Sequence, residues 1–581
     1  MKKSIFIAIL LAVPALVLAQ KGGLDPTDIF KPLSDQWTSY SGDMTGKRFS
    51  ALKQINTQTV KNLSLRWVNN NITTACGPNG TGPAAAAGGG RGGPGGPGGG
   101  GRGGFGGGTA APIIVGGLGD GSVNNCGPTR FGGGILYVDG VLYGASINDV
   151  YAIDARDGSV IWHYYWKFRG GTTTGTRGPS MWHGYIYFEL HDDWVVCLDA
   201  KTGREVWKKE IAPFEQQYFS TNVPMVIGNH IIVGTGNDTD EPAYLKSLDP
   251  ETGEEQWRFY STAQKAGDPG LETWASLDAA RHGGGTSWIP GSYDPETHLY
   301  LFGTGNPTPA YTQGRGDGDN LYTSCLLALD VETGKLKWYF STSPHDTHDW
   351  DSTETPILAD AMFGGKMRKL VMMATRNGYF YVLDRVTGEH LVTSKLGLVN
   401  NYASDVSPDS KLNLNKRGEV QRNPHKDASI AGSLVNGDVL NFPPPTFSPD
   451  TGLFYVYEMN MLHIAYLLEP DPRGSMGLGG INENGGGATW PTYLIAVDYQ
   501  TGKVKWRHEL TTNSQGLTST AGGVLFMSNG GGIEAVRATD GKPLWHAEIG
   551  NLTSPPETFL VDGKQHVLAT GAGGLYMFVL N

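Results

Sequence analysis

Charged residues and cysteine are scarce in this chain of 581 residues. Asp, Glu, Lys and Arg together make up 17% of it, and the net charge is −11. An acidic balance argues against a protein that binds nucleic acid, because such proteins present basic surfaces. The sequence contains 4 cysteines and no Cys-x-x-Cys-His motif, so we expect no haem to be attached covalently to this chain.

Long hydrophobic runs are also missing after the first 19 residues. No later segment approaches the about 20 apolar residues that a membrane-spanning helix needs. Residues 1–19 have two lysines near the start, an apolar run and a small residue, Ala19, at the end. This pattern is typical of a secretory signal peptide, and the alternative is a membrane anchor. We therefore expect an exported protein, periplasmic or secreted, without stable membrane insertion.

The cysteines fall into two kinds. Cys76 and Cys126 each begin a Cys-Gly-Pro sequence and flank a tract, residues 77–125, that is dominated by glycine. In an oxidising compartment we expect these two to form a disulfide. The tract holds too little apolar surface to offset the entropy cost of ordering it, which predicts a disordered or loosely held insertion. Cys197 and Cys325 lie in apolar strand patterns and are expected to be buried thiols.

Glycine is abundant, with 85 residues, and much of it belongs to a repeated unit. Each unit has an apolar strand pattern, a polar turn containing Gly, and a second strand that usually contains Trp, which is the pattern of a β-hairpin. The seven copies are residues 151–162, 195–207, 245–257, 326–338, 381–392, 494–506 and 533–545.

Repeated hairpins separated by further strands predict repeated four-stranded sheets, none of which can bury its faces alone. Closure into a ring leaves only short, protected edges, so we expect a β-propeller. The strand pattern at 573–581 lacks a following Trp strand, and residues 62–67 form a Trp strand without a predecessor. The two ends would therefore complete one blade. The prediction is an all-β, eight-bladed propeller of four-stranded antiparallel blades, one domain over residues 20–581.

Polar residues gather at predicted strand ends between residues 283 and 351. The motifs are GGGTSW at 283–288, GTGNPTP at 303–309 and PHDTHDWD at 344–351. Loops at the ends of strands are where a β scaffold presents binding and catalytic side chains. We therefore expect a functional site here.

These motifs, together with residues 36–67, resemble the pyrroloquinoline quinone (PQQ)-dependent alcohol dehydrogenases, with the motif order of the methanol dehydrogenase type. The resemblance covers nearly all of the chain apart from the glycine-rich tract. It implies a dehydrogenase that transfers a hydride from an alcohol, or a related hydroxyl or aldehyde substrate, to PQQ. The electrons would then pass to a separate acceptor, such as a cytochrome.

The resemblance implies cofactor-binding residues. Trp288 matches the Trp that lies under the planar cofactor, and the alternative is an ordinary core Trp. Arg376 matches the Arg that hydrogen-bonds the reactive quinone oxygens, and Arg177 matches a second Arg that contacts the cofactor. The remaining matches are Asn441 and, more weakly, Thr221 and Thr235.

The resemblance also implies a metal and a base. Asp349 matches the catalytic base, and the alternative is a solvated acid in a turn. Asn306 matches a metal ligand, and Asp238 stands where the family has a ligand Glu. Asp351 matches the additional acid of members that use a lanthanide, where members that use calcium often carry Ala. The implied ligands are Asp238, Asn306, Asp349 and Asp351, and Ca²⁺ and a lanthanide both remain open.

Three departures from the family leave a second interpretation open. Gly171 and Thr172 replace a pair of adjacent cysteines, residues 513–518 replace a Trp, and residues 130–134 lack a cofactor-contacting acid. These losses favour a non-catalytic PQQ-like propeller that binds proteins in the periplasm as an assembly factor. The family residues that are retained, above all Asp349 and its neighbours, favour the enzyme.

Overall fold

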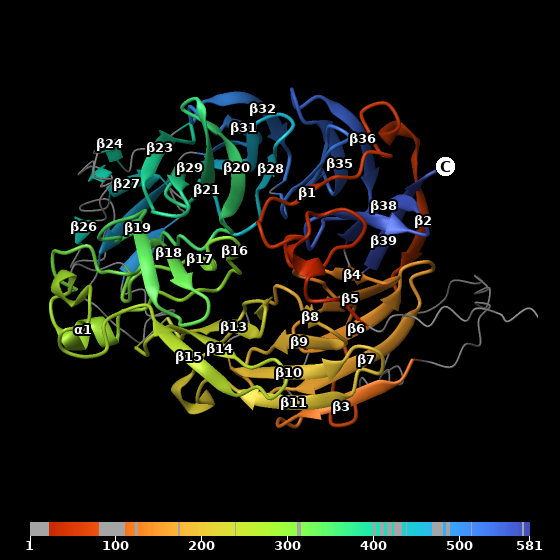
Figure 1. The fold of residues 1–581 in the computed structure, drawn as a ribbon, viewed down its shortest axis with the longest axis horizontal. Helices are drawn as coiled ribbons and strands as arrows, with labels where there is room; N and C mark the ends of the chain where they lie inside the picture. The colour runs from red at the N-terminus through yellow and green to blue at the C-terminus, as the bar shows by residue number, and fades with distance from the viewer. Residues whose placement is uncertain are drawn as a thin grey trace, which may run out of the picture.

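The computed structural model describes residues 23–80, 111–121, 126–171, 175–238, 240–310, 315–398, 403–406, 412–414, 421–422, 433–436, 439–467, 480–483, 489–512, 514–571 and 574–581. Its strands form eight four-stranded antiparallel blades around a ring (Figure 1), which confirms the predicted propeller. Within these ranges no helix has the length and apolar character needed to cross a membrane. The predicted signal peptide and most of the glycine-rich tract, residues 81–110 and 122–125, lie outside the described residues.

The first four complete blades follow one another along the chain. They are β4–β7 (Leu136–Val138, Val141–Ala145, Asp149–Asp154, Val160–Lys167), β8–β11 (Ser180–Trp182, Tyr185–Glu189, Trp194–Asp199, Glu205–Glu210), β12–β15 (Met225–Ile227, His230–Thr235, Tyr244–Leu248, Glu255–Tyr260) and β16–β19 (Ser292–Asp294, Leu299–Gly303, Cys325–Asp330, Leu336–Ser341).

Three more blades continue the ring. They are β20–β23 (Ile357–Phe363, Lys366–Ala374, Tyr379–Asp384, His390–Lys395), β28, β29, β31 and β32 (Thr446–Ser448, Leu453–Leu467, Thr489–Asp498, Val504–Leu510) and β33–β36 (Thr518–Thr520, Val524–Asn529, Gly532–Arg537, Pro543–Glu548). Shorter elements are β1 (Phe49–Ser50), β24–β27 (Ala403–Val406, Leu412–Leu414, Gln421–Arg422, Ser433–Asn436), β30 (Gly480–Glu483), η1–η4 (Asp28–Phe30, Val60–Asn62, Phe214–Gln216, Leu271–Thr273) and α1 (Leu277–Arg281).

The eighth blade joins the two ends of the chain, as predicted. Its strands β37 (Glu557–Val561), β38 (Lys564–Gly571) and β39 (Gly574–Leu580) come from the C-terminus, and its outer strand β2 (Leu63–Asn69) comes from near the N-terminus. Strand β2 pairs antiparallel with β39, and Figure 1 shows the red and blue strands side by side. The ring is therefore closed by backbone hydrogen bonds between its ends.

The repeated unit forms the third and fourth strands of a blade. In the unit at 195–207 the carboxylate of Asp199 accepts hydrogen bonds from the backbone N and hydroxyl of Thr202, at 2.8 and 2.6 Å. Gly203 then adopts a φ of +70°, a left-handed conformation that glycine takes without strain. We call the end of the blades that carries these connections the turn face.

The Trp of one unit packs on the Gly of the next blade. Trp162 donates a hydrogen bond from its indole nitrogen to the carbonyl of Ala200 at 2.9 Å. A Cβ atom added to Gly203 would lie 2.7 Å from the same indole ring, so the Trp requires the Gly. The same indole-to-carbonyl bond recurs for the pairs Trp67–Ala155, Trp207–Pro250, Trp257–Val331 and Trp338–Arg385. The Trp and the Gly recur at the same positions of the repeat, and their contacts join neighbouring blades.

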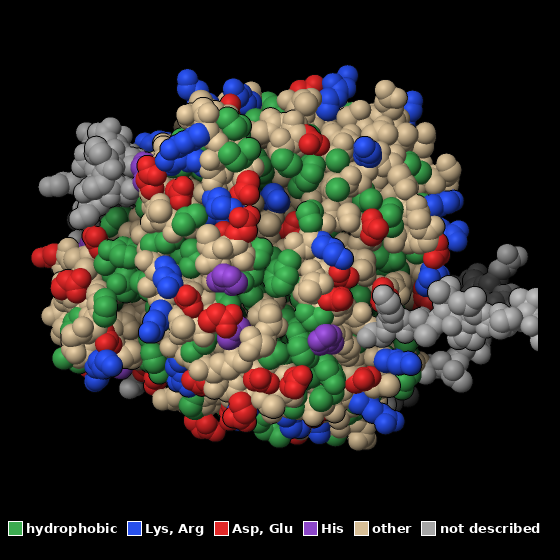
Figure 2. All heavy atoms as spheres, in the orientation of Figure 1, with side chains coloured by type: hydrophobic (Ala, Val, Ile, Leu, Met, Phe, Trp, Pro, Cys, Tyr) green, Lys and Arg blue, Asp and Glu red, His purple; other side chains and the backbone are tan. Residues whose placement is uncertain are grey.

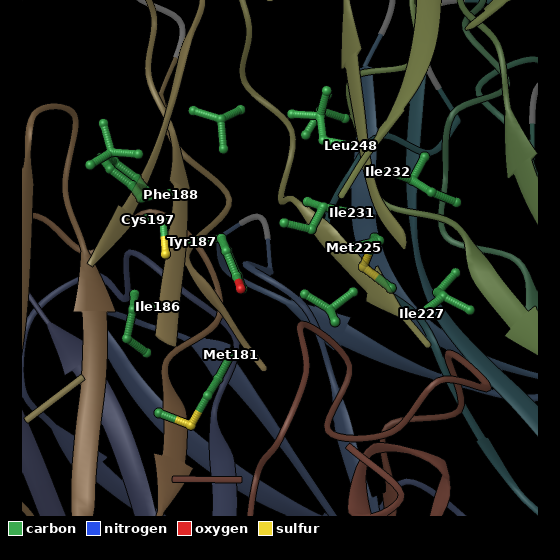
Figure 3. Close-up of a cluster of buried hydrophobic side chains, with 14 of the residues drawn as sticks. Met181, Ile186, Tyr187, Phe188, Cys197, Met225, Ile227, Ile231, Ile232 and Leu248 are labelled. Atoms are coloured by element: carbon green, nitrogen blue, oxygen red, sulfur yellow. The ribbon is translucent and has the colours of Figure 1, made fainter. Parts of the chain in front are cut away.

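Apolar side chains fill the space between blades. Figure 3 shows side chains of β8–β10, such as Tyr187 and Cys197, facing Met225 and Ile231 from β12 and β13 across such an interface. Cys197 and Cys325 are buried free thiols, as predicted. On the outside, acidic and basic side chains are intermixed over the face drawn in Figure 2.

The predicted disulfide between Cys76 and Cys126 is present. The prediction of a loosely held tract is wrong for one part of the tract, because Ile113–Gly117 forms strand β3 and pairs in parallel with β7. The side chain of Ile114 packs against the core of the blade, which gives this segment the apolar contact that the glycine-rich sequence around it lacks.

Candidate active site

One cavity of about 270 Å³ brings together nine of the ten candidate binding and catalytic residues. Its lining is formed by Arg177, Phe219, Thr221, Asp238, Thr286, Trp288, Asn306, Asp349, Asp351, Arg376, Asn441 and Phe442. The tenth candidate, Thr235, is not part of the lining, and its hydroxyl donates to the carboxylate of Asp193 at 2.8 Å. Residues that are up to 265 positions apart in sequence, Arg177 and Phe442, thus meet at one place.

The topology of the blades explains this gathering. Trp288 and Asp349 precede the first strand of their blades, β16 and β20, whereas Asn306 and Arg376 follow the second strands, β17 and β21. In an antiparallel blade the start of the first strand and the end of the second lie at the same end of the sheet. We call this end the cavity face. It lies opposite the turn face.

Aromatic rings and a buried cation line one side of the cavity. The guanidinium carbon of Arg177 lies 4.2 Å from the ring centre of Phe442 and 5.3 Å from that of Trp288. Burial lowers the pKa of Arg177, and its Nε atom has no hydrogen-bond partner within the described part of the chain. A flat aromatic surface beside a buried positive charge suits a planar, negatively charged ligand.

Acidic side chains also line the cavity. Asp351 accepts a hydrogen bond from Arg376 Nη1 at 2.7 Å with one carboxylate oxygen and from the backbone N of Asn306 at 2.9 Å with the other. Arg376 Nη2 also lies 3.8 Å from a carboxylate oxygen of Asp349. Burial raises the pKa of Asp351, and the positive charge of Arg376 opposes this. Arg376 thus partly balances two of the three acids.

Asp238 enters the cavity from the loop after β13. Its backbone has a φ of +54°, and its carboxylate accepts a hydrogen bond from the Thr286 hydroxyl at 2.9 Å. Burial, and then the negative charge of Asp351, raise the pKa of Asp238 to about 6, while the hydrogen bond from Thr286 lowers it. The cavity therefore holds carboxylates that repel one another.

The turn at 344–351 directs Asp349 into the cavity. Asp346, at the start of the turn, accepts hydrogen bonds from the backbone N of His348 and of Trp350 at 2.9 and 2.8 Å. The ring of His348 stacks on that of Trp350, with centres 4.0 Å apart. Asp349 lies between them with a φ of +61°, a conformation in which Asp is enriched among non-glycine residues, and its side chain is 21% exposed.

Several residues that shape the site had no signal in the sequence. Phe442 lies beside the predicted Asn441, and its backbone N donates to the side-chain oxygen of Asn441 at 2.7 Å. Thr286 lies in the predicted GGGTSW motif without a predicted role. Near residues 130–134, where the family acid is missing, Glu557 of β37 accepts a hydrogen bond from the Ile135 backbone N at 2.8 Å, outside the cavity lining.

The residues present fit a hard cation and an anionic planar cofactor. The donors on the acidic side are carboxylate and amide oxygens, which Ca²⁺ and lanthanide ions prefer. Across the described ranges no three His, Cys, Asp or Glu side chains form a ready-made metal site. Burial, and to a smaller extent neighbouring carboxylates, raise the pKa of Asp238 and of Asp351, and a bound cation would favour their ionised forms.

Comparison with known proteins identifies the family of the chain. The family model of the glucose/ethanol/alcohol dehydrogenase β-propeller domain matches residues 125–401. The model of the outer membrane protein assembly factor BamB matches residues 489–580, which contain the repeated hairpins but only the last blades of the ring. The second match is therefore a match to the repeat.

Two curated relatives are alcohol dehydrogenases. The chain is 31% identical to the quinohemoprotein alcohol dehydrogenase of Comamonas testosteroni over 93% of its own length and 73% of that protein. It is 31% identical to the quinoprotein alcohol dehydrogenase PedH of Pseudomonas putida over 76% of its own length and 78% of that protein.

A solved structure with a similar fold is also that of an alcohol dehydrogenase. The crystal structure of the quinohemoprotein alcohol dehydrogenase from Comamonas testosteroni matches with a TM-score of 0.77 and 26% identity, covering 96% of this chain and 82% of that one. The cavity face thus sits on a scaffold whose relatives oxidise alcohols. This chain belongs to the PQQ-dependent quinoprotein alcohol dehydrogenases, a family of oxidoreductases.

Proposed function

We propose that the cavity oxidises a primary alcohol, or a related hydroxyl or aldehyde substrate, with Asp349 as the catalytic base. The observation that carries this proposal is that Asp349, Asp351, Arg376 and Asn306 line one cavity together with Trp288 and Arg177. The family membership of the chain supports the same chemistry.

PQQ, when bound, supplies the hydride acceptor, and a cation beside it supplies a Lewis acid. Trp288 provides the flat face against which the cofactor stacks, and Arg177 provides positive charge and an unused donor. Asn441 and Thr221 offer polar groups at the same wall. Thr235 is not part of the lining, and its hydroxyl donates to the backbone carbonyl of the lining residue Phe219 at 3.2 Å.

Asp349 removes the proton from the substrate hydroxyl. A positioned base contributes a factor of about 10² to 10⁴ to the rate, provided that it is ionised when the substrate binds. The guanidinium of Arg376 lies 3.8 Å from a carboxylate oxygen of Asp349. Arg376 also offers hydrogen-bond donors and positive charge where an oxygen becomes anionic during the reaction, which stabilises the transition state.

The metal ligands are proposed to be Asp238, Asn306, Asp349 and Asp351. Asp238 is shorter than the Glu of the family, and its left-handed backbone brings it into the cavity lining. The three carboxylates together suit an ion with a high charge, because ligand charge tunes affinity for hard cations. The proposed ion is Ca²⁺ or a lanthanide.

Electrons are proposed to leave to a separate carrier, such as a cytochrome, because this sequence has no motif for a covalently attached haem. The signal-like pattern of residues 1–19 supports a periplasmic or secreted location. The substrate is a small molecule, and neither nucleic acid nor membrane insertion is part of the proposal.

The test is reconstitution of the purified protein with PQQ and either Ca²⁺ or La³⁺, followed by a panel of alcohols and an artificial electron-accepting dye. We expect dye reduction that depends on alcohol, PQQ and one of the metals, and a quinone absorption band that stays with the protein after gel filtration. Absence of both turnover and bound quinone would support the alternative, a non-catalytic propeller that binds proteins.

A further inference from the structure

Arg315 is a fully buried cation outside the cavity lining. Its side chain and backbone together are 2% exposed, and burial lowers the pKa of its guanidinium to about 10. Arginine is rarely buried to this extent unless its charge and donors are used. Its partners therefore show what it does.

The guanidinium of Arg315 joins two loops. From one nitrogen it donates to the backbone carbonyls of Pro309 and Ala310, the latter at 3.1 Å, and both belong to the loop that carries Asn306. From another nitrogen it donates to the carbonyl of Asp346 at 2.5 Å, in the turn that carries Asp349.

The remaining guanidinium nitrogen of Arg315, Nε, is also hydrogen-bonded. Nε of Arg315 donates to the side-chain oxygen of Asn320 at 3.1 Å, and the amide of Asn320 in turn donates to the carbonyl of Thr273 at 3.2 Å. The planar fork is thus held in one orientation. Lysine, with a single ammonium group, cannot reach three separate acceptors in this geometry.

The two loops also touch inside the cavity, where the carboxylate of Asp351 accepts from the backbone N of Asn306 at 2.9 Å. Arg315 and Asp351 therefore connect the same pair of loops at two places, one behind the cavity and one within it. Two contacts hold the loops in position better than one, and position matters because a catalytic group misplaced by about 1 Å can lower the reaction rate by about 100-fold.

We propose that Arg315 is a positioning residue for the reaction, which fixes the turn of Asp349 relative to the loop of Asn306 through the carbonyls of Asp346, Pro309 and Ala310. This inference rests on the proposed roles of Asp349 and Asn306. Arg315 touches neither substrate nor cofactor, and it acts through the backbone of the two loops.

The chain offers a matched control. Arg385 is also buried, at 5% exposure, but it lies on the turn face and pairs with Asp294 at 2.8 Å and with Asp360 at 2.6 Å. The variant Arg385→Ala removes a buried ion pair on the opposite face from the cavity loops. It therefore measures the stability that is lost when any buried arginine is deleted.

The experiment compares Arg315→Ala, Arg315→Lys and Arg385→Ala as holoenzymes. We expect kcat of Arg315→Ala to fall about 10- to 100-fold with KM and bound PQQ little changed, and we expect millimolar guanidinium to restore part of it. Arg315→Lys should remain low, and Arg385→Ala should melt earlier but keep kcat. A wild-type kcat in Arg315→Ala would overturn the proposal.

A second readout needs no turnover. Hydrogen–deuterium exchange of residues 344–352 in the apoprotein should rise in Arg315→Ala and stay unchanged in Arg385→Ala. If the wild type oxidises no alcohol, the proposed function fails, and exchange still decides whether Arg315 holds the turn. If Arg315→Ala does not fold, Arg315→Lys takes its place in both measurements, and unchanged exchange and kcat there would overturn the proposal.

Discussion

The two ends of the same blades differ in how their side chains are used. On the turn face one hairpin recurs, usually with the same Asp, Gly and Trp, and in four of its seven copies the Trp donates a hydrogen bond to the neighbouring blade. On the cavity face each blade contributes different residues, and these meet in one cavity. The turn face therefore stabilises the ring through a repeated unit, while the proposed active site on the cavity face consists of residues that occur once.

The two faces also differ in how their buried charged side chains are paired. On the turn face Arg385 is paired directly with two carboxylates. On the cavity face Asp238 and Asp351 repel each other, and the carboxylates there exceed the nearby positive charge. Excess charge of this kind is costly in a folded protein unless a ligand offsets it, which is why such clusters mark functional sites.

Removal of the proposed metal should affect activity at the cavity face and leave the stability of the turn face unchanged, and this is the largest difference that we expect. Treatment of the holoenzyme with a chelator should abolish turnover while the ring remains folded, because the ligands lie only on the cavity face. Dye reduction and circular dichroism measure the two properties. Full activity of a metal-free preparation would contradict the assignment of the ligands.

The variant Asp351→Ala tests whether the proposed site distinguishes Ca²⁺ from La³⁺. It should keep activation by Ca²⁺ better than activation by La³⁺, because a trivalent ion gains more from the additional carboxylate. Equal loss with both ions would indicate that Asp351 acts through Arg376 and Asn306 instead.

On the turn face, Trp162→Ala should lower stability by about 3 to 5 kcal/mol, the usual cost of deleting a buried Trp. Trp162 is 1% exposed and bonds to the next blade, so its loss opens an interface between blades. Urea denaturation measures the effect, and kcat of the folded variant should stay near wild type. Trp490→Ala, at an exposed position, is the control and should change little.

The disulfide of Cys76 and Cys126 should matter less. The double variant to Ser should lose about 2 to 4 kcal/mol of stability near the insertion, because the bond closes a long loop. A reductant should lower the melting temperature of the wild type to that of the double variant and leave the variant unchanged. A large loss of turnover in the double variant would show that the insertion takes part in the cavity.

The last expected effect is a pH dependence of stability. Burial raises the pKa of Glu189 from 4.5 to about 8, and the charge of Asp193 adds to this while Ser220 opposes it. The folded state therefore holds a proton that the unfolded state releases above pH 4.5, so stability falls as pH rises toward 8. Glu189→Gln should flatten this decline in melting temperature, and Glu254→Gln, at an exposed position, should not.

The turn face could be predicted from sequence because each hairpin is local. Asp199, Thr202 and Gly203 lie within five residues, and their bonds follow from the turn itself. The closure of the ring could also be predicted, because residues 62–67 and 573–581 are complementary halves of one repeat.

The cavity face could be predicted only where a motif resembles the family. Trp288, Asn306 and Asp349 were found in this way. Arg315 carried no signal, because most of its partners are backbone carbonyls, which no pattern of side chains in the sequence reveals. Strand β3 was missed for a similar reason, since its apolar residues stand inside a tract whose overall composition predicts disorder.

The most direct test of the account is a single turnover in the absence of an electron acceptor. Wild-type and Asp349→Ala holoenzymes with equal bound PQQ are mixed with alcohol, and the quinone absorption is followed with time. The account predicts rapid loss of the quinone band in the wild type and a loss slower by a factor of about 100 or more in the variant. Equal rates in the two proteins would show that Asp349 is not the base.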